Sequence, residues 1–190
     1  MKFRAALTGH VKELQPLRQG YLDGLCGLYA LINAARLAVP MLPLRTCRRL
    51  FREGAHWLHT KGAFPAVLYS GMSNNKVISL HKAVFQHRIP GLRLKRPFTR
   101  SPPVDATEFW TRLKAYADRP GNGVIICIEG RRLSHWTVVY GVTPDRVTLF
   151  DSDGRAYLIR QKCSCSVGDA EAPTIILPGC ISILAYTQRG

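Results

Sequence analysis

The chain has 190 residues, 46% of them hydrophobic, which suits a single folded domain over residues 1–190 and excludes wholesale disorder. No segment approaches the roughly 18 uninterrupted apolar residues of a membrane-spanning helix, so we expect no membrane span. The formal net charge of +15 favours acidic partners. The basic residues are scattered and no nucleic-acid-reading motif accompanies them, so we do not expect nucleic-acid binding as the main function.

The N-terminal segment has one short apolar patch followed by charges and prolines, which is not the pattern of a signal peptide. We therefore expect synthesis in the cytoplasm, and export by a route that reads no signal peptide stays open. In that compartment the six cysteines are expected as free thiols, with Cys47 and Cys127 in the core. The spacing of Cys163, Cys165 and Cys180 matches no common zinc pattern, so we expect no metal and no cofactor.

The first part of the chain predicts helices. Apolar residues recur at helical spacing until Pro40, and similar patterns follow further along. Asp105 with Glu108 three residues later forms a capping-box pattern that opens another helix. Before it, alternating apolar and basic residues predict a strand at the edge of a sheet. The expected helices cover residues 25–39, 44–58, 77–87 and 105–116, and the expected edge strand covers 91–98.

Beyond Gly121 the pattern changes to short β-branched runs separated by turn residues. Such runs favour an antiparallel meander. The sequence therefore predicts an α+β fold, in which N-terminal helices with a buried central helix pack on a C-terminal antiparallel sheet. The expected strands cover residues 124–128, 136–142, 147–150, 157–159, 174–177 and 180–186.

Cys26 opens the buried central helix, directly after Asp23-Gly24, which can turn and cap it. The unpaired N–H groups and dipole of a helix N-terminus favour a thiolate. Gly27 lets a substrate approach the thiol closely. A cysteine in an apolar helix is more often a packing residue, so this position gains weight only from the residues downstream.

His135 opens the strand HWTVVYGV, and Asp151 ends the next strand. A hairpin turn between them brings an imidazole and a carboxylate together on one face if the loop has three or five residues. Such a histidine can take the proton of a thiol, and the carboxylate holds its tautomer. Alternation puts Trp136 on the opposite face, where we expect it to pack.

An acyl-transfer site also needs hydrogen-bond donors for the oxyanion of the tetrahedral intermediate. The backbone N–H of Cys26 is one natural donor. The side-chain amide of Gln19, seven residues upstream, is a candidate for the other.

Together, QGYLDGLCGLYALINA and SHWTVVYGVTPDRVTLFDSDG resemble the papain-like cysteine peptidase superfamily, and within it the bacterial double-glycine leader peptidases of bacteriocin exporters. The resemblance covers about a quarter of the chain. It implies a papain-like fold with Cys26 as nucleophile, His135 as general base, Asp151 as the residue that orients the base, and Gln19 as oxyanion donor. The motif Asp23-Gly-Leu-Cys also resembles the corresponding motif of ovarian-tumour-type deubiquitinases, a branch of the same superfamily.

Two departures from the family pattern leave alternatives open. The family glutamine usually lies six residues before the cysteine, so Gln19 requires a bulge, or another donor serves. The family also tends to place proline after the aspartate, where this chain has Ser152 and Asp153. Asp153 is therefore a rival to Asp151 as the orienting carboxylate, although strand geometry favours Asp151.

These residues predict a hydrolase that cleaves a peptide or isopeptide bond through an acyl-enzyme on Cys26. A transglutaminase-like acyltransferase would use the same groups with an amine as acceptor. A non-catalytic basic binding module on the same fold is the third reading. The expected partner is a protein or peptide substrate, and the basic charge suggests an acidic one. Since no transporter is joined to the chain, we expect a processing enzyme, an injected effector or a mobile-element protein.

Overall fold

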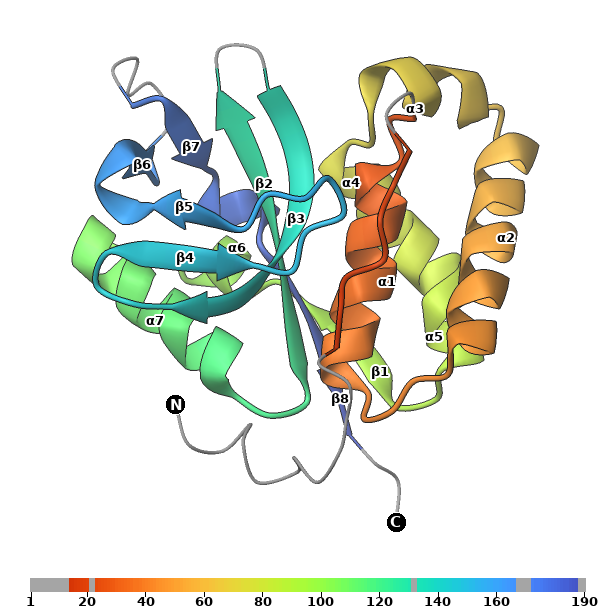
Figure 1. Ribbon diagram of the computed structural model, residues 1–190, viewed down its shortest axis with the longest axis horizontal. Coiled ribbons are helices and arrows are strands. Elements are labelled where there is room, and N and C mark those ends of the chain that lie inside the picture. Colours follow the sequence, from red (N-terminus) through yellow and green to blue (C-terminus); the bar gives the residue numbers. More distant parts are fainter. Residues whose placement is uncertain (1–13, 21–22, 131–132, 167–171, 188–190) are drawn as a thin grey trace.

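A computed structural model describes residues 14–20, 23–130, 133–166 and 172–187. Within these residues the chain is α+β, with helices in the N-terminal half and an antiparallel sheet in the C-terminal half, as the sequence predicts (Figure 1). Among the helices so described, none has the length and apolar character needed to cross a membrane.

The two longest helices of the first half confirm the apolar periodicity. They are α1 (Cys26–Ala38) and α2 (Leu44–Thr60). A third helix, α3 (Phe64–Ser70), was not expected, because its 7 residues are too few for an apolar pattern to repeat. A proline in the first turn, where the missing N–H costs nothing, helps to start it.

The helix predicted over residues 77–87 is present but not uniform. It consists of α4 (Asn74–Leu80), the π-helical turn η2 (His81–Phe85) and the short α5 (Gln86–Arg88). A π-turn widens the helix locally and changes which side chains face inward. His81, at the start of that turn, is only 1% exposed.

The predicted edge strand is shorter than expected. It forms β1 (Leu92–Lys95) and is followed by a short helix, α6 (Pro97–Arg100). The capping prediction is confirmed, because Asp105 accepts a hydrogen bond from the Glu108 N–H at 2.7 Å at the start of α7 (Ala106–Asp118). The Glu108 side chain accepts from the Val104 N–H at 2.8 Å, so both ends of the cap are satisfied.

The described strands form one eight-stranded sheet in the order β1-β8-β2-β3-β4-β5, with β7 on β2 and β6 on β7. All pairs are antiparallel except β6 with β7. Short 3₁₀ turns, η3 (Arg160–Lys162) and η4 (Pro178–Cys180), lie between the last strands. The remaining strands are β2 (Asn122–Gly130), β3 (Leu133–Val142), β4 (Arg146–Leu149), β5 (Tyr157–Ile159), β6 (Cys163–Ser164), β7 (Thr174–Ile176) and β8 (Ser182–Tyr186).

The expected simple meander is wrong beyond β5, because β7 pairs with β2 and runs parallel to β6, and β8 also leaves the meander. Strands β2 to β5 do follow one another as a meander, but β8 returns across the sheet and lies between β1 and β2. It thereby joins β1, which comes before α7 in the chain, to the rest of the sheet. The apolar pattern of a strand gives its faces but not its neighbours, so the sequence could not reveal this return.

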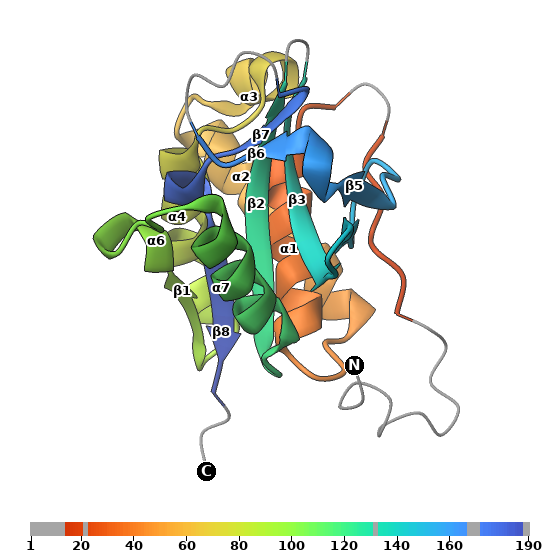
Figure 2. The ribbon, with the colours of Figure 1, turned by 90° about the vertical axis from the view of Figure 1, so that its left-hand side faces the viewer.

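Two apolar cores lie on opposite faces of the sheet. Helix α1 packs on one face of β2 and β3, and α7 packs on the other face (Figure 2). Both faces of β2 are therefore buried, which explains its nearly uninterrupted apolar sequence. The N-terminus of α1, which carries Cys26, is held beside the beginning of β3 by this packing.

Candidate active site

Cys26 is the first residue of α1 and is 5% exposed. The preceding turn is held by Asp23, whose carboxylate accepts hydrogen bonds from the Gly20 N–H at 2.8 Å and the Leu25 N–H at 3.1 Å. The helix cap itself is Leu25, which offers no side-chain acceptor, so Asp23 acts just before the helix. The N–H groups of the first turn lack helical carbonyl partners and favour negative charge at the Cys26 thiol.

An extended segment delivers Gln19 to the same end of α1. It runs along the helix in Figure 1 and is fixed by Asn33, which is 0% exposed. The Asn33 side chain accepts from the Leu17 N–H at 2.9 Å and donates to the Leu17 carbonyl at 3.1 Å. Arg36 donates to the carbonyl of Gln15 in the same segment. Two polar side chains on α1 therefore set the position of the segment.

His135 and Asp151 form a buried pair. The His135 Nε2 lies 2.6 Å from Asp151 Oδ2, and the two residues are 4% and 2% exposed. The other carboxylate oxygen, Oδ1, accepts from the backbone N–H groups of Asp153 at 2.9 Å and Arg155 at 3.0 Å. Both oxygens of Asp151 are thus engaged, which fixes the carboxylate in one orientation.

The turn between these residues is not the one expected. The Thr143 N–H donates to the Arg146 carbonyl at 2.8 Å, which leaves Pro144 and Asp145 as the turn in place of a three- or five-residue loop. With a turn of even length, two residues on opposite strands point to opposite faces when their numbers differ by an even number. Residues 135 and 151 are such a pair. The turn alone would therefore separate His135 from Asp151.

A β-bulge in β3 brings the two residues back to one face. The pairing with β4 shifts between Val139 and Gly141, which makes Tyr140 the extra residue. Beyond the bulge the Phe150 N–H donates to the Val138 carbonyl at 2.8 Å. Residue 151 consequently lies opposite residue 137 and on the same face as residue 135, two positions along the strand.

His135 and Asp151 each stabilise the charged form of the other. Burial opposes a charged imidazole, but the neighbouring Asp151 carboxylate and Cys26 side chain outweigh it and raise the pKa of His135 to about 9. Burial likewise opposes the carboxylate, yet the hydrogen bond with His135 holds the pKa of Asp151 below its usual value. An imidazolium beside a carboxylate is therefore the favoured state at neutral pH.

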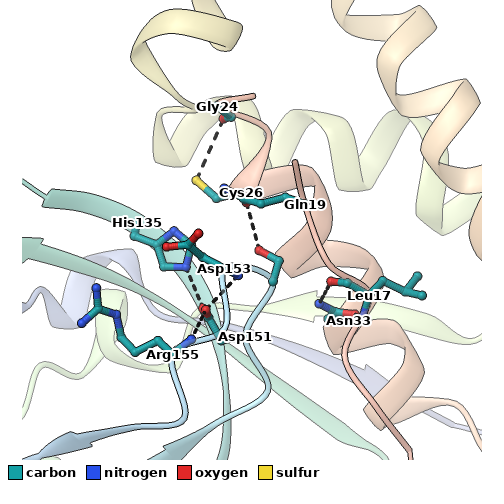
Figure 3. A network of polar contacts seen from close by, with 10 residues as sticks. Leu17, Gln19, Gly24, Cys26, Asn33, His135, Asp151, Asp153 and Arg155 are labelled. Atoms are coloured by element: carbon teal, nitrogen blue, oxygen red, sulfur yellow. Dashed lines mark hydrogen bonds and ion pairs between the residues drawn. The ribbon is translucent and has the colours of Figure 1, made fainter. Parts of the chain in front are cut away.

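The imidazole connects Asp151 to Cys26. Figure 3 shows the His135 ring between the Asp151 carboxylate and the sulfur of Cys26. Because Nε2 is bound to Asp151, Nδ1 is the ring nitrogen available to the thiol. The Cys26 Sγ also lies 4.0 Å from the Gly24 carbonyl, a weak contact. The predicted nucleophile, base and orienting carboxylate thus lie close together, with the hydrogen bond between His135 and Asp151 formed.

Gln19 lies at the edge of this group. Its backbone N–H donates to the Ser152 carbonyl at 3.0 Å, and its Oε1 accepts from the Ser152 hydroxyl at 3.0 Å. Figure 3 shows the side chain extending toward Cys26. Since Ser152 engages the oxygen, the amide NH₂ of Gln19 is left to donate elsewhere. The bulge that its unusual spacing requires would lie between Gln19 and Cys26, a stretch that includes residues 21–22, which are outside the described residues.

The rival carboxylate and the neighbouring tryptophan take other places. Asp153 is exposed and contributes its backbone N–H to Asp151, while it is the Asp151 carboxylate that contacts His135. Trp136 is 3% exposed, lies in the core beside α1 and donates from Nε1 to the Met72 carbonyl at 2.6 Å. The expectation that Trp136 packs is confirmed.

Three buried residues around the candidate site were missed by the sequence reasoning. Thr137 carries a visible signal, because alternation places it on the face of His135. Asn33 is also detectable in retrospect, as the polar residue of a buried apolar helix face. Nothing in the sequence singles out Ser152, whose partner lies 133 residues away.

The other cysteines are set apart from the candidate site by their surroundings. Cys47 and Cys127 are buried, as expected, and burial raises the pKa of the Cys127 thiol to about 12 and that of Cys163 to about 11. Burial also raises the pKa values of Cys47, Cys165 and Cys180. Within the described ranges, no group of three or more His, Cys, Asp and Glu side chains is arranged to hold a metal ion.

Comparison with known proteins does not assign the chain. No protein-family model, no curated protein and no solved structure matches it.

Proposed function

We propose that the chain is a papain-like cysteine peptidase that cleaves a peptide or isopeptide bond through an acyl-enzyme on Cys26. One observation carries the proposal: the buried His135–Asp151 pair lies at the helix N-terminus that presents the Cys26 thiol. A buried charged pair is costly unless its partners are well placed, so its position beside a thiol favours catalysis over a structural role. The packing of α1 on an antiparallel sheet is consistent with a papain-like fold.

The chemistry follows from the roles that this geometry allows. His135 holds the proton taken from Cys26, and the thiolate sulfur forms a bond to the substrate carbonyl carbon while the C=O π pair moves to oxygen. The tetrahedral intermediate collapses, the C–N bond breaks, and the proton on His135 passes to the leaving amine. A water molecule, deprotonated by His135, then attacks the thioester and releases the acid and Cys26.

Asp151 keeps the imidazole ready for both proton transfers. Its carboxylate holds Nε2, so the ring presents Nδ1 to the sulfur and is stabilised when protonated. The backbone N–H of Cys26 and the side-chain NH₂ of Gln19 would donate hydrogen bonds to the oxyanion. Each such donor is worth on the order of 3 kcal/mol in the transition state. Ser152 supports this role because it fixes the orientation of the Gln19 amide.

The first test is selective alkylation of the native protein with iodoacetamide at pH 7, followed by mass spectrometry of each cysteine. We expect Cys26 to react fastest, because the His135 imidazolium stabilises its thiolate. The remaining five thiols have pKa values raised by burial and serve as internal references. Equal labelling of all six, or slowest labelling of Cys26, would contradict an activated thiol.

The second test is a proteome-wide cleavage profile with wild type and Cys26→Ala. Cys180→Ala serves as the matched control, since Cys180 is a half-buried free thiol in the η4 turn, on a different element from the candidate site residues. We expect new peptide termini with wild type and Cys180→Ala and none with Cys26→Ala. Adding a primary amine distinguishes the acceptor: an amide in place of the acid product would indicate acyl transfer and overturn hydrolysis.

A further inference from the structure

A cleft unrelated to Cys26 lies where β1 and β8 meet α6 and the end of α7. It has a volume of about 880 Å³, within the usual range for small-molecule sites. Figure 2 shows α6 and α7 on one side of the sheet, next to β1 and β8. Residues from four separate stretches of the chain, 78–82, 94–100, 116–122 and 183–187, line it, so the cleft is formed by the tertiary fold and not by one loop.

The charge of this cleft has one sign. None of the described lining residues is acidic. Five of them carry cationic side chains: Lys82, Lys95, Arg96, Arg100 and Arg119. Two tyrosines, Tyr116 and Tyr186, add phenol groups to the same walls. A cleft lined by one sign of charge concentrates the electrostatic potential and attracts counter-ions.

The five cations are not neutralised from outside the cleft. In the part of the chain that the structure describes, none of them takes part in an ion pair. Only Arg96 has a side-chain hydrogen bond, from Nη2 to the Gly179 carbonyl at 2.9 Å, and its Nε is buried without a partner. Elsewhere on the surface, arginines such as Arg49, Arg88 and Arg112 do pair with glutamates. The cleft therefore keeps free donors that a ligand can use.

We propose that this cleft binds a compact ligand carrying several phosphate groups. Three of the five cations are arginines, whose planar guanidinium groups match phosphate oxygens with paired hydrogen bonds. Cations on several walls of one half-open cleft suit a compact polyanion better than an extended acidic peptide. The ligand is either a free polyphosphorylated molecule or the headgroup of a phosphorylated lipid.

The cleft is remote from the candidate active site. It lies beside the C-terminal end of α1. Gly121, between the cleft residues Arg119 and Asn122, is so near this end that a Cβ added to it would lie 4.0 Å from the carbonyl oxygen of Ala38, the last residue of α1. Cys26 is at the opposite end of that helix, which is roughly 18 Å long. Ligand binding in the cleft is thus separable from cleavage, and the test below needs no activity of Cys26.

Isothermal titration calorimetry of the whole chain with inositol hexakisphosphate, ATP and inorganic phosphate as probes tests the proposal. We expect one saturable site, with affinity falling from the hexakisphosphate to ATP to phosphate. Arg100→Gln and Arg119→Gln should each weaken hexakisphosphate binding about tenfold, because each removes charge-assisted hydrogen bonds. The matched control is the double variant Arg45→Gln/Arg48→Gln, exposed on α2 outside the cleft, which should leave the affinity within about twofold.

The same variants are then tested by co-sedimentation with vesicles that contain phosphatidylinositol bisphosphate. Binding of both vesicles and free hexakisphosphate supports a soluble ligand, whereas binding of vesicles alone assigns the site to a lipid headgroup. Equal losses of affinity in the cleft variants and the α2 control would show that net charge alone explains the binding, and would overturn the proposal. Displacement of the hexakisphosphate by an equal charge of polyglutamate would assign the cleft to an acidic peptide and also overturn it.

Discussion

His135 and His81 are both buried histidines, with 4% and 1% of their surface exposed, but their environments shift the imidazole pKa in opposite directions. His135 contacts the Asp151 carboxylate, and its pKa is raised to about 9. His81 stacks on Phe85 at the π-turn, and neither of its ring nitrogens has a hydrogen-bond partner in the described structure. Burial, together with the charges of Arg93 and Lys82, lowers its pKa to about 4.

The contrast teaches that burial alone does not mark a functional histidine. Desolvation acts in the same direction on both rings, against the charged form. What separates them is a carboxylate with two more hydrogen bonds behind it, which reverses the sign for His135. The following predictions test this difference, and they begin with the largest effect.

Replacing each histidine by glutamine breaks the comparison most directly. His135→Gln should lower kcat/KM on a peptide found by cleavage profiling by at least about a thousandfold, because the general base is lost. His81→Gln should change it by less than about threefold. The rate of Cys26 alkylation at pH 7 is the second readout. Similar losses in both variants, with folding intact by circular dichroism, would remove the proposed role of His135.

The carboxylate behind His135 is tested by Asp151→Asn, with Asp153→Asn as the matched control. Asp151→Asn should reduce kcat by about a hundredfold or more, since the imidazole loses its orienting charge. The backbone contact of Asp153 survives in Asp153→Asn, which should stay near wild-type activity.

The pH profile gives the same comparison an independent readout. The kcat/KM of wild type should fall as the pH rises past about 9, where His135 loses its proton. In Asp151→Asn this alkaline limb should move to lower pH. An unchanged limb would mean that Asp151 does not set the charge of the imidazole.

The two histidines should also affect stability at opposite ends of the pH range. The raised pKa of His135 contributes stability that is complete below about pH 6.5 and is lost as the pH rises through about 9. The lowered pKa of His81 means that the unfolded chain takes up the proton first, so the free energy of unfolding falls between pH 6.5 and about 4. Replacing His81 with Phe should recover roughly 2–3 kcal/mol of this loss at pH 4.5.

Urea unfolding of wild type and His81→Phe at pH 7 and pH 4.5 measures that difference. If both proteins lose the same free energy of unfolding on acidification, His81 is not the buried neutral group responsible. At pH 7 the expected effect is smallest: His81→Phe should stabilise the fold by about 1 kcal/mol or less, because two unpartnered ring nitrogens are removed and the stacking on Phe85 is kept. A clear loss of stability at pH 7 would reveal a polar role for the ring.

The sequence predicted local structure well where a periodic pattern was long. Helices α1, α2 and α7 lie close to their expected bounds, because apolar spacing and the Asp105 cap act locally. The return of β8 between β1 and β2 was not predictable, since it depends on the packing of segments far apart in the chain. The burial of His81 was hidden for a similar reason, because a π-turn changes which residues face inward.

The candidate site was partly predictable for the same reason. The juxtaposition of His135 and Asp151 follows from two neighbouring strands, and the structure places them together. The expected route was nevertheless wrong, since the turn has even length and the bulge at Tyr140 supplies the missing residue. Contacts such as that of Ser152 with Gln19 join residues 133 positions apart in the chain, and no local pattern encodes them.

The bulge at Tyr140 and the turn at Pro144–Asp145 are the two places where this hairpin can change its length without moving the buried pair. Pairing with β2 fixes residues 133–139 of β3, and residues 149 and 150 lie opposite 139 and 138. A residue added at the turn gives a longer loop and leaves this pairing as it is. Related chains that keep the pair are therefore expected to vary in length at the turn or the bulge, and not within residues 135–139 or 149–151.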